Sequence, residues 1–144
     1  MPKDLSPNFI TQKLTMGNAN EKVNIDSIAF SPNISILCDP GVGTVYWKTA
    51  TVNAHFDISP VLTYGPPSDI FPLGEIKTIT AIVQLGATPY NFAAFRINGL
   101  SQTIKWAGGS APTLATSAFN VFTFSIIRTA TDTYTVLGTW TKFA

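Results

Sequence analysis

Charged residues are scarce in this chain of 144 residues. They make up 12% of it, against roughly 25% in typical soluble domains. The formal net charge is only +1, so no basic field draws nucleic acid or an anionic membrane to the protein, and we expect neither as a partner. So weakly charged a surface, with a mean hydropathy of +0.22, favours burial of part of it by self-association or in a larger assembly.

Cysteine and long hydrophobic runs are also rare. Cys38 is the only cysteine, which excludes an internal disulfide and a cysteine-based metal cluster. No apolar run approaches the roughly 18 residues that a membrane helix needs, and the first residues lack the hydrophobic segment of a secretory signal. The carboxylates are scattered, without the close pair typical of a glycosidase or the spacing of a Ca²⁺ loop. We therefore predict no membrane insertion, no metal and no cofactor.

Alternation of apolar and polar residues with a period of two is the main structural signal, and it is clearest in residues 120–143. Phe122, Phe124 and Ile126 fall on one face of an extended strand, and after a short polar break the alternation resumes from Tyr134 to Trp140. The pattern predicts a hairpin at this end of the chain. Because a hairpin is not stable alone, its aromatic face needs cover from other strands.

The upstream chain can supply those strands. A long run at residues 45–58 places Val52, Ala54, Phe56 and Ile58 on one face, and residues 76–85 form the most apolar segment, a candidate central strand. Asn98-Gly99 between two strand-like runs is a strong hairpin signal, because both residues tolerate positive φ. No window shows helical periodicity. The sequence predicts an all-β fold, a single antiparallel β-sandwich or jelly-roll-like domain at residues 21–144, with roughly eight to ten strands.

Residues 1–20 differ from the rest and are interpreted as an extended N-terminal arm. Two prolines and a Gly-Asn-rich exit punctuate this segment. Its isolated apolar residues are candidate docking anchors: Leu5, Phe9, Ile10, Leu14 and Met16. Such a segment can lie in a groove of a partner or add a strand to a neighbouring sheet. A frayed terminus is the alternative, and the sequence leaves both open.

His55, Asp57 and Ser59 invite a catalytic triad interpretation. Alternate residues of one strand lie about 7 Å apart in a row, whereas a triad needs its nucleophile and carboxylate to converge on the imidazole. No G-x-S-x-G turn is present, and the loop at residues 39–44 lacks the glycine and lysine pattern of a nucleotide loop. We predict that the protein is not an enzyme.

Aromatic residues are abundant, and most of them are expected in the core. Tyr64 and Tyr90 fall in expected loops, where aromatic rings can stack on sugars. They are the candidate contacts with a ligand, receptor or host surface glycan.

Residues 106–112 (WAGGSAP) form a distinctive element in the C-terminal half. With the strand-like runs that follow it, this half resembles a β module of tailed-bacteriophage virion proteins. The resemblance rests on residues 104–113 (IKWAGGSAPT), a W-x-G-G-x-A-P element, followed by residues 122–129 (FTFSIIRT) and residues 134–138 (YTVLG). It covers roughly residues 76–144 and is similar to modules of phage tail-fibre and other structural proteins, cyanophage ones among them. The resemblance implies a virion location, a role in structure and assembly, and a homotrimer. It carries over no catalytic residue.

Three functions follow as hypotheses. The first is a structural protein of a tailed-phage virion, a capsid decoration (cement) protein that docks on other virion proteins as a multimer. The second is a tail-fibre or receptor-binding module that contacts host surface glycan or protein. The third is a small lectin or carbohydrate-active enzyme, against which the missing carboxylate pair weighs.

Overall fold

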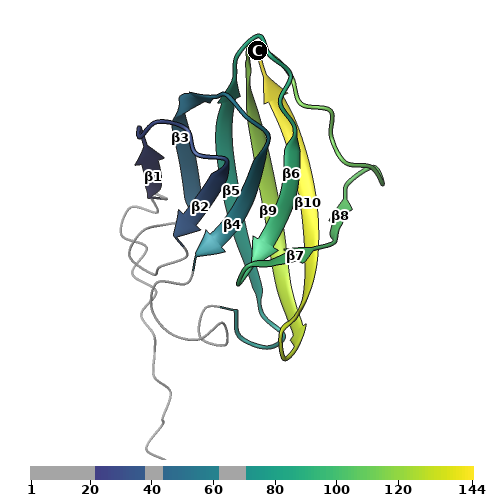
Figure 1. Ribbon diagram of the computed structural model, residues 1–144. Coiled ribbons are helices and arrows are strands. Elements are labelled where there is room, and N and C mark those ends of the chain that lie inside the picture. Colours follow the sequence, from purple (N-terminus) through teal and green to yellow (C-terminus); the bar gives the residue numbers. More distant parts are fainter. Residues whose placement is uncertain (1–21, 38–43, 62–70) are drawn as a thin grey trace, which may run out of the picture.

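The computed structural model describes residues 22–37, 44–61 and 71–144, and within them the fold is all-β, without a helix (Figure 1). The predicted arm at residues 1–20 therefore lies outside the described residues. The described residues form ten strands: β1 (Val23–Asp26), β2 (Asn33–Leu37), β3 (Val45–Val52), β4 (Phe56–Val61), β5 (Ile76–Leu85), β6 (Phe92–Ile97), β7 (Leu100–Gln102), β8 (Ile104–Trp106), β9 (Ala118–Ala130) and β10 (Thr133–Phe143).

The strands form two mixed sheets. The larger has six strands in the order β1-β3-β5-β9-β10-β8, and the smaller has four in the order β2-β4-β6-β7. Parallel pairs join β1 to β3, β3 to β5, β2 to β4, β4 to β6, and β8 to β10. The prediction of an antiparallel domain is therefore wrong in this respect. The reason is the winding: successive strands from β1 to β6 alternate between the two sheets, so each strand returns parallel to the one before it in its own sheet.

The same winding corrects the long strand expected at residues 45–58. The chain leaves the larger sheet after Val52 and enters the smaller sheet at Phe56, so the segment forms two strands. Val52, Phe56 and Ile58 are buried as predicted. Ala54 lies in the crossing between the sheets.

Both predicted hairpins are confirmed. β9 and β10 pair antiparallel through Phe124 and Gly138 at the middle of their register. Asn98 and Gly99 join β6 to β7 with φ values of 51° and 77°, as a type I′ turn requires. β5 is the expected central strand, with β3 on one side and β9 on the other.

One hydrophobic core joins the two sheets. Phe122, Phe124 and Ile126 of β9 are fully buried, which confirms the predicted register of the terminal hairpin. Across the core, the Phe95 ring of β6 lies 4.4 Å from the Phe124 ring, measured between centroids. The Phe56 ring of β4 contacts Phe122 edge-on at 6.2 Å. The aromatic face of the hairpin is thus covered by the smaller sheet.

Gly138 of β10 is packed closely against β8, the edge strand that pairs with β10. A Cβ at this position would lie 2.7 Å from Ile104 Cγ2 and 2.9 Å from the Trp106 ring. We expect Gly138→Ala to lower the free energy of unfolding by about 1–3 kcal/mol, because the added methyl overpacks this contact. Gly86→Ala is the control, since its Cβ would meet only Thr51 Cγ2, at 3.3 Å. Chemical denaturation measures both, and equal effects would contradict the packing at Gly138.

Candidate functional site

The outer face of the larger sheet carries no charged side chain on five of its six strands. Inward and outward positions follow from the alternating burial of β3, β5, β9 and β10 and from the register that pairs them. The outward residues, named here the uncharged face, are Val23, Ile25, Val45, Trp47, Ile76, Thr78, Thr80, Ile82, Gln84, Phe119, Val121, Thr123, Ser125, Ile127, Thr135, Leu137, Thr139, Thr141 and Phe143. Lys105, paired with Leu137, follows on the edge strand β8.

Hydroxyl side chains form a band across the middle of the uncharged face. Thr80, Thr123 and Thr139 are register partners on β5, β9 and β10. The hydroxyl oxygens of Thr80 and Thr123 lie 3.5 Å apart, and those of Thr78 and Ser125 lie 3.3 Å apart. These groups are therefore partly satisfied by one another across the strands.

An apolar hollow lies at one end of the uncharged face. Trp47, Ile82, Phe119, Val121 and Phe143 line a space of about 420 Å³. The rings of Trp47 and Phe119 meet edge-on at 6.4 Å. The indole Nε1 of Trp47 is buried, and among the described residues it has no hydrogen-bond partner. Buried N–H groups are nearly always paired in native structures, so this donor is an exception among the described residues.

Large exposed hydrophobic side chains also gather on the uncharged face. Ile76 is 63% exposed and Phe143 is 58% exposed. Val23, Ile25 and Leu137 of the same face are exposed as well. Large exposed apolar side chains that share one uncharged sheet face indicate an interaction site. The uncharged face is therefore the candidate functional site.

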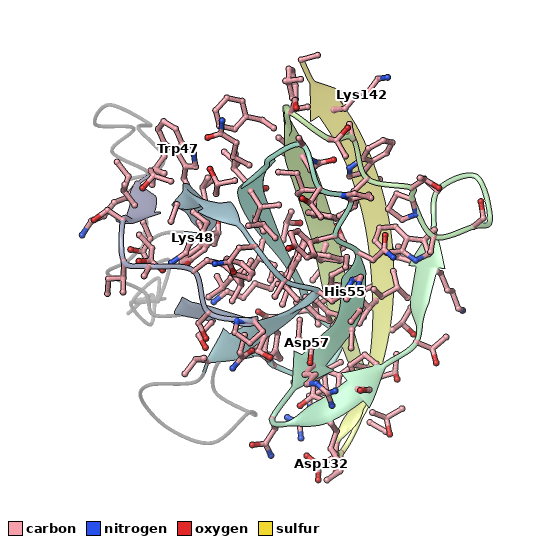
Figure 2. All side chains as sticks on the ribbon, turned by 45° about the horizontal axis from the view of Figure 1, so that its top comes forward. Trp47, Lys48, His55, Asp57, Asp132 and Lys142 are labelled. Carbon is pink, nitrogen blue, oxygen red and sulfur yellow. The ribbon has the colours of Figure 1, made fainter. Side chains whose placement is uncertain are left out.

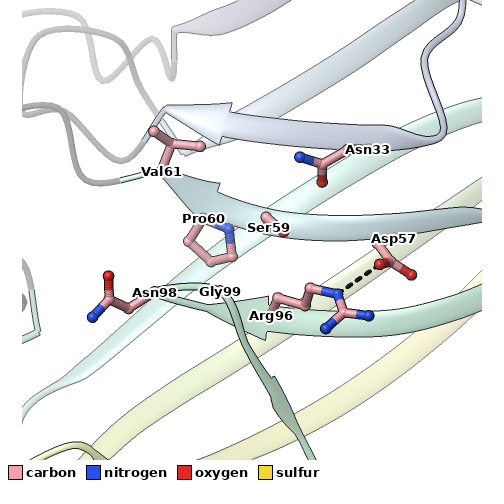
Figure 3. Close-up of a pocket in the computed structure, with 8 residues that line it drawn as sticks. All are labelled: Asn33, Asp57, Ser59, Pro60, Val61, Arg96, Asn98 and Gly99. Carbon is pink, nitrogen blue, oxygen red and sulfur yellow. Dashed lines mark hydrogen bonds and ion pairs between the residues drawn. The ribbon is translucent and has the colours of Figure 1, made fainter.

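The outer face of the smaller sheet is polar by contrast. Asn33, Asp57, Ser59, Arg96 and Asn98 line an open groove of about 610 Å³ (Figure 3). Arg96 Nε donates to Asp57 Oδ2 at 2.6 Å across adjacent strands. A partly exposed pair of this kind contributes at most about 1 kcal/mol to stability. The groove presents hydrogen-bonding groups suited to a polar ligand and is a second candidate site.

The structure does not assemble His55, Asp57 and Ser59 into a triad. His55 Nδ1 accepts a hydrogen bond from the Asn91 backbone N–H at 3.0 Å. The Asp57 carboxylate instead binds Arg96. Asp132 lies at the tip of the terminal hairpin, away from His55 (Figure 2). In this arrangement His55 acts as a hydrogen-bond acceptor for the backbone. The absence of enzymatic activity stays a prediction.

We expect His55→Ala to lower the free energy of unfolding by only about 1 kcal/mol, because it removes one hydrogen bond at an exposed position. Assembly and particle binding should not change. Thermal melting and a binding assay measure these two quantities. Loss of a measurable hydrolytic activity in this variant would contradict the prediction that the protein is not an enzyme.

Tyr90 lies where the sequence placed it, between strands, and packs edge-on against the His55 ring at 5.8 Å. Its ring is half-buried against the core, so packing already uses part of the surface that a sugar would need. Tyr64 and Cys38 lie outside the described residues, and so do residues 39–43 of the loop that the sequence analysis compared with a nucleotide loop. The arm anchors Leu5, Phe9, Ile10, Leu14 and Met16 lie outside them too, so their roles stay predictions.

Asp26, Tyr46 and Lys48 form a cluster that sequence reasoning missed. Lys48 follows Trp47 on β3 but points to the inner side of the sheet, where it is only 3% exposed (Figure 2). Its Nζ donates to Asp26 Oδ2 at 2.7 Å and to the Ile28 carbonyl at 2.8 Å, and the Tyr46 hydroxyl also donates to Asp26. Nothing in the spacing of these residues signals the cluster, because β1 and β3 meet only in the fold.

Charges within the cluster shift two pKa values. Burial raises the pKa of Asp26. Hydrogen bonds from Lys48, Tyr46 and the Ile28 N–H together lower it by more, so the pKa of Asp26 is below its ordinary value. Burial, followed by the hydrogen bond to Asp26, raises the pKa of the Tyr46 hydroxyl. The cluster ties β1 to β3 at the edge of the larger sheet.

No group of three or more metal-ligating side chains occurs in the part of the chain that the structure describes. That part also contains no helix long and apolar enough to cross a membrane. Comparison of the chain with protein-family models, with curated proteins and with solved structures finds no match.

Proposed function

We propose that the protein is a structural protein of a tailed-phage virion, a capsid decoration protein that docks on the particle as a multimer. The observation that carries the multimer is the uncharged face, with its apolar hollow and its exposed Ile76 and Phe143. Virion identity rests on the resemblance of residues 104–138 to phage modules. The two-sheet body fits a β-sandwich, in which each sheet turns one face to the core and the other face outward.

The proposed mechanism is burial of the uncharged face between neighbouring copies of this protein, which assemble at junctions of the particle. Desolvation of Ile76, Leu137 and Phe143 is favourable, and no buried charge opposes it. The polar groove of the smaller sheet, on the other side of the core, stays in solvent. Residues 1–20 are proposed to add docking contacts as an extended arm. The added contacts would resist internal pressure without any chemical step.

A tail-fibre or receptor-binding module is the second candidate, because the polar groove offers a specific site. Asp57, Arg96 and Asn98 supply a carboxylate, a guanidinium and an amide to one open groove. Such groups suit hydroxyl-rich host glycans. On this alternative the groove and Tyr90, with Tyr64, would contact the host.

Imaging of phage particles that carry a label on this protein tests the proposal. We expect label on the capsid lattice at regular positions. Label at the tail tip would support the receptor-binding module instead. Absence of label from the particle would overturn both candidates.

A further inference from the structure

We propose that the uncharged face packs against the same face of a second copy of this chain, related by a two-fold axis. This inference rests on the proposed function only in requiring a multimer, and it names the partner that covers the face. It differs from the homotrimer that the phage resemblance implies. The mass of the assembled protein decides between them.

The charge distribution favours a second copy as the occupant. A partner selected by charge complementarity would need charged groups to meet, and the five strands of the uncharged face offer none. An isologous contact places each patch against itself, so any charge near its centre would repel its own copy. A face without charge is therefore compatible with a self-contact.

The two ends of the uncharged face complement each other. Aromatic side chains surround the hollow at one end, near Phe119 and Phe143. Aliphatic side chains stand at the other end: Ile76, Ile127 and Leu137. A copy reversed about the middle row of Thr80, Thr123 and Thr139 brings the aliphatic end of each face over the hollow of the other.

The reversal also gives the hydroxyl groups a use. The threonine band of one copy lies over the same band of the second copy, where hydroxyls can exchange hydrogen bonds. Thr78 and Ser125 are register partners beside the aliphatic end. Their 3.3 Å contact with each other keeps these two hydroxyls partly satisfied where they face the hollow of the other copy.

The size of the face agrees with a stable contact. The five strands of the face average about nine residues, or about 30 Å, and at a spacing of about 4.8 Å they cover roughly 700 Å² per copy. Stable interfaces bury about 800 Å² per partner. The face is thus large enough to hold two copies together without a further partner.

Substitution of Thr139 by glutamate tests the inference. Thr139 is exposed on the uncharged face, so Thr139→Glu leaves the folded domain intact while placing two buried charges in each pair. We expect the dissociation constant to rise at least about 100-fold, because uncompensated charges at an interface cost several kcal/mol. Ser101→Glu is the matched control, since Ser101 is exposed beside Arg96 on the outer face of the smaller sheet. Thr141→Glu, also exposed, is the second test variant.

Light scattering of the purified full chain at micromolar concentrations gives the masses, and circular dichroism verifies that each variant is folded. We expect a dimer for the parent and Ser101→Glu, and a monomer for Thr139→Glu and Thr141→Glu. A monomeric parent, a trimeric parent, or dimeric Thr139→Glu and Thr141→Glu would each overturn the two-fold pair. Imaging of labelled particles tests the virion proposal separately. A protein that is dimeric but absent from particles would contradict the proposed function and leave the two-fold pair standing. A protein that is monomeric but present on capsids would contradict the two-fold pair and leave the proposed function standing.

Discussion

Replacing Phe124 with alanine is expected to lower the free energy of unfolding by about 3–5 kcal/mol. The Phe124 ring is fully buried and contacts rings from both sheets, Phe95 at 4.4 Å and Trp106 at 6.0 Å. Deletion leaves a cavity at the centre of the core that surrounding strands, hydrogen-bonded on both sides, cannot close. Urea denaturation monitored by tryptophan fluorescence measures the loss.

Thr123→Ala is the control for Phe124→Ala. Thr123 is adjacent on β9 but belongs to the uncharged face, and its hydroxyl makes only a 3.5 Å contact with Thr80. We expect its cost to be below about 1 kcal/mol in the dissociated protein. Equal costs at the two positions would mean that the inward and outward sides of β9 have been exchanged.

Replacing Asp26 with alanine is expected to cost a similar amount, about 3–5 kcal/mol, because the Lys48 ammonium would stay buried without its counter-charge. The double variant Asp26→Ala with Lys48→Met should recover much of the lost stability, since it removes both charges and leaves the methionine packed. A cost for Asp26→Ala below about 1 kcal/mol would show that the pair behaves as a solvated surface pair.

The Asp26 contribution should also depend on pH. Its pKa in the folded protein is below the ordinary value of 3.8, so the unfolded chain binds the proton more readily. The contribution is fully present above pH 3.8 and is lost as the pH falls through the lower folded pKa. The difference in unfolding free energy between the parent and Asp26→Ala should therefore be constant near neutrality and shrink only below that pH. A difference that shrinks near neutral pH would assign the stabilisation to another group.

Local patterns predicted the hairpins because their information is local. Phe122, Phe124 and Ile126 alternate within a single strand, and Asn98-Gly99 encodes its own turn through positive φ. The Gly108-Gly109 pair of the phage-like element likewise has φ values of 85° and 84°, which other residues rarely adopt. In these segments the preference of each residue and the final fold agree.

The winding of the first six strands could not be predicted in the same way. Two consecutive strands show the same alternation of apolar and polar residues whether they pair in one sheet or lie in different sheets. Only the long-range pairing of the strands distinguishes the two cases. Asn120 shows the same limit. It is fully buried in a strand of apolar inward positions, yet it accepts from the Ala115 N–H at 2.9 Å and from the Trp140 indole at 3.1 Å.

The sequence indicated that part of the surface is covered, but it did not predict which residues form the uncharged face. The low charge content suggested that some surface is covered, and alternating threonines were visible in β10. Which side chains share the face depends on β3, β5, β9 and β10 being neighbours, and β3 lies far from β10 in sequence. Trp47 and Phe119, for example, line one hollow across 72 positions of chain.

The central claim is that the uncharged face is covered in the assembled protein, and thiol labelling tests it most directly. Thr139→Cys on the uncharged face and Ser101→Cys on the outer face of the smaller sheet, each combined with Cys38→Ser, place one thiol at two positions that are both exposed in the isolated domain. The rate of maleimide labelling would be measured on the assembled protein and after dilution to the monomer. The account predicts that the thiol at 139 reacts much more slowly in the assembly and as fast as the thiol at 101 after dilution. Equal rates for both thiols in the assembly would contradict it.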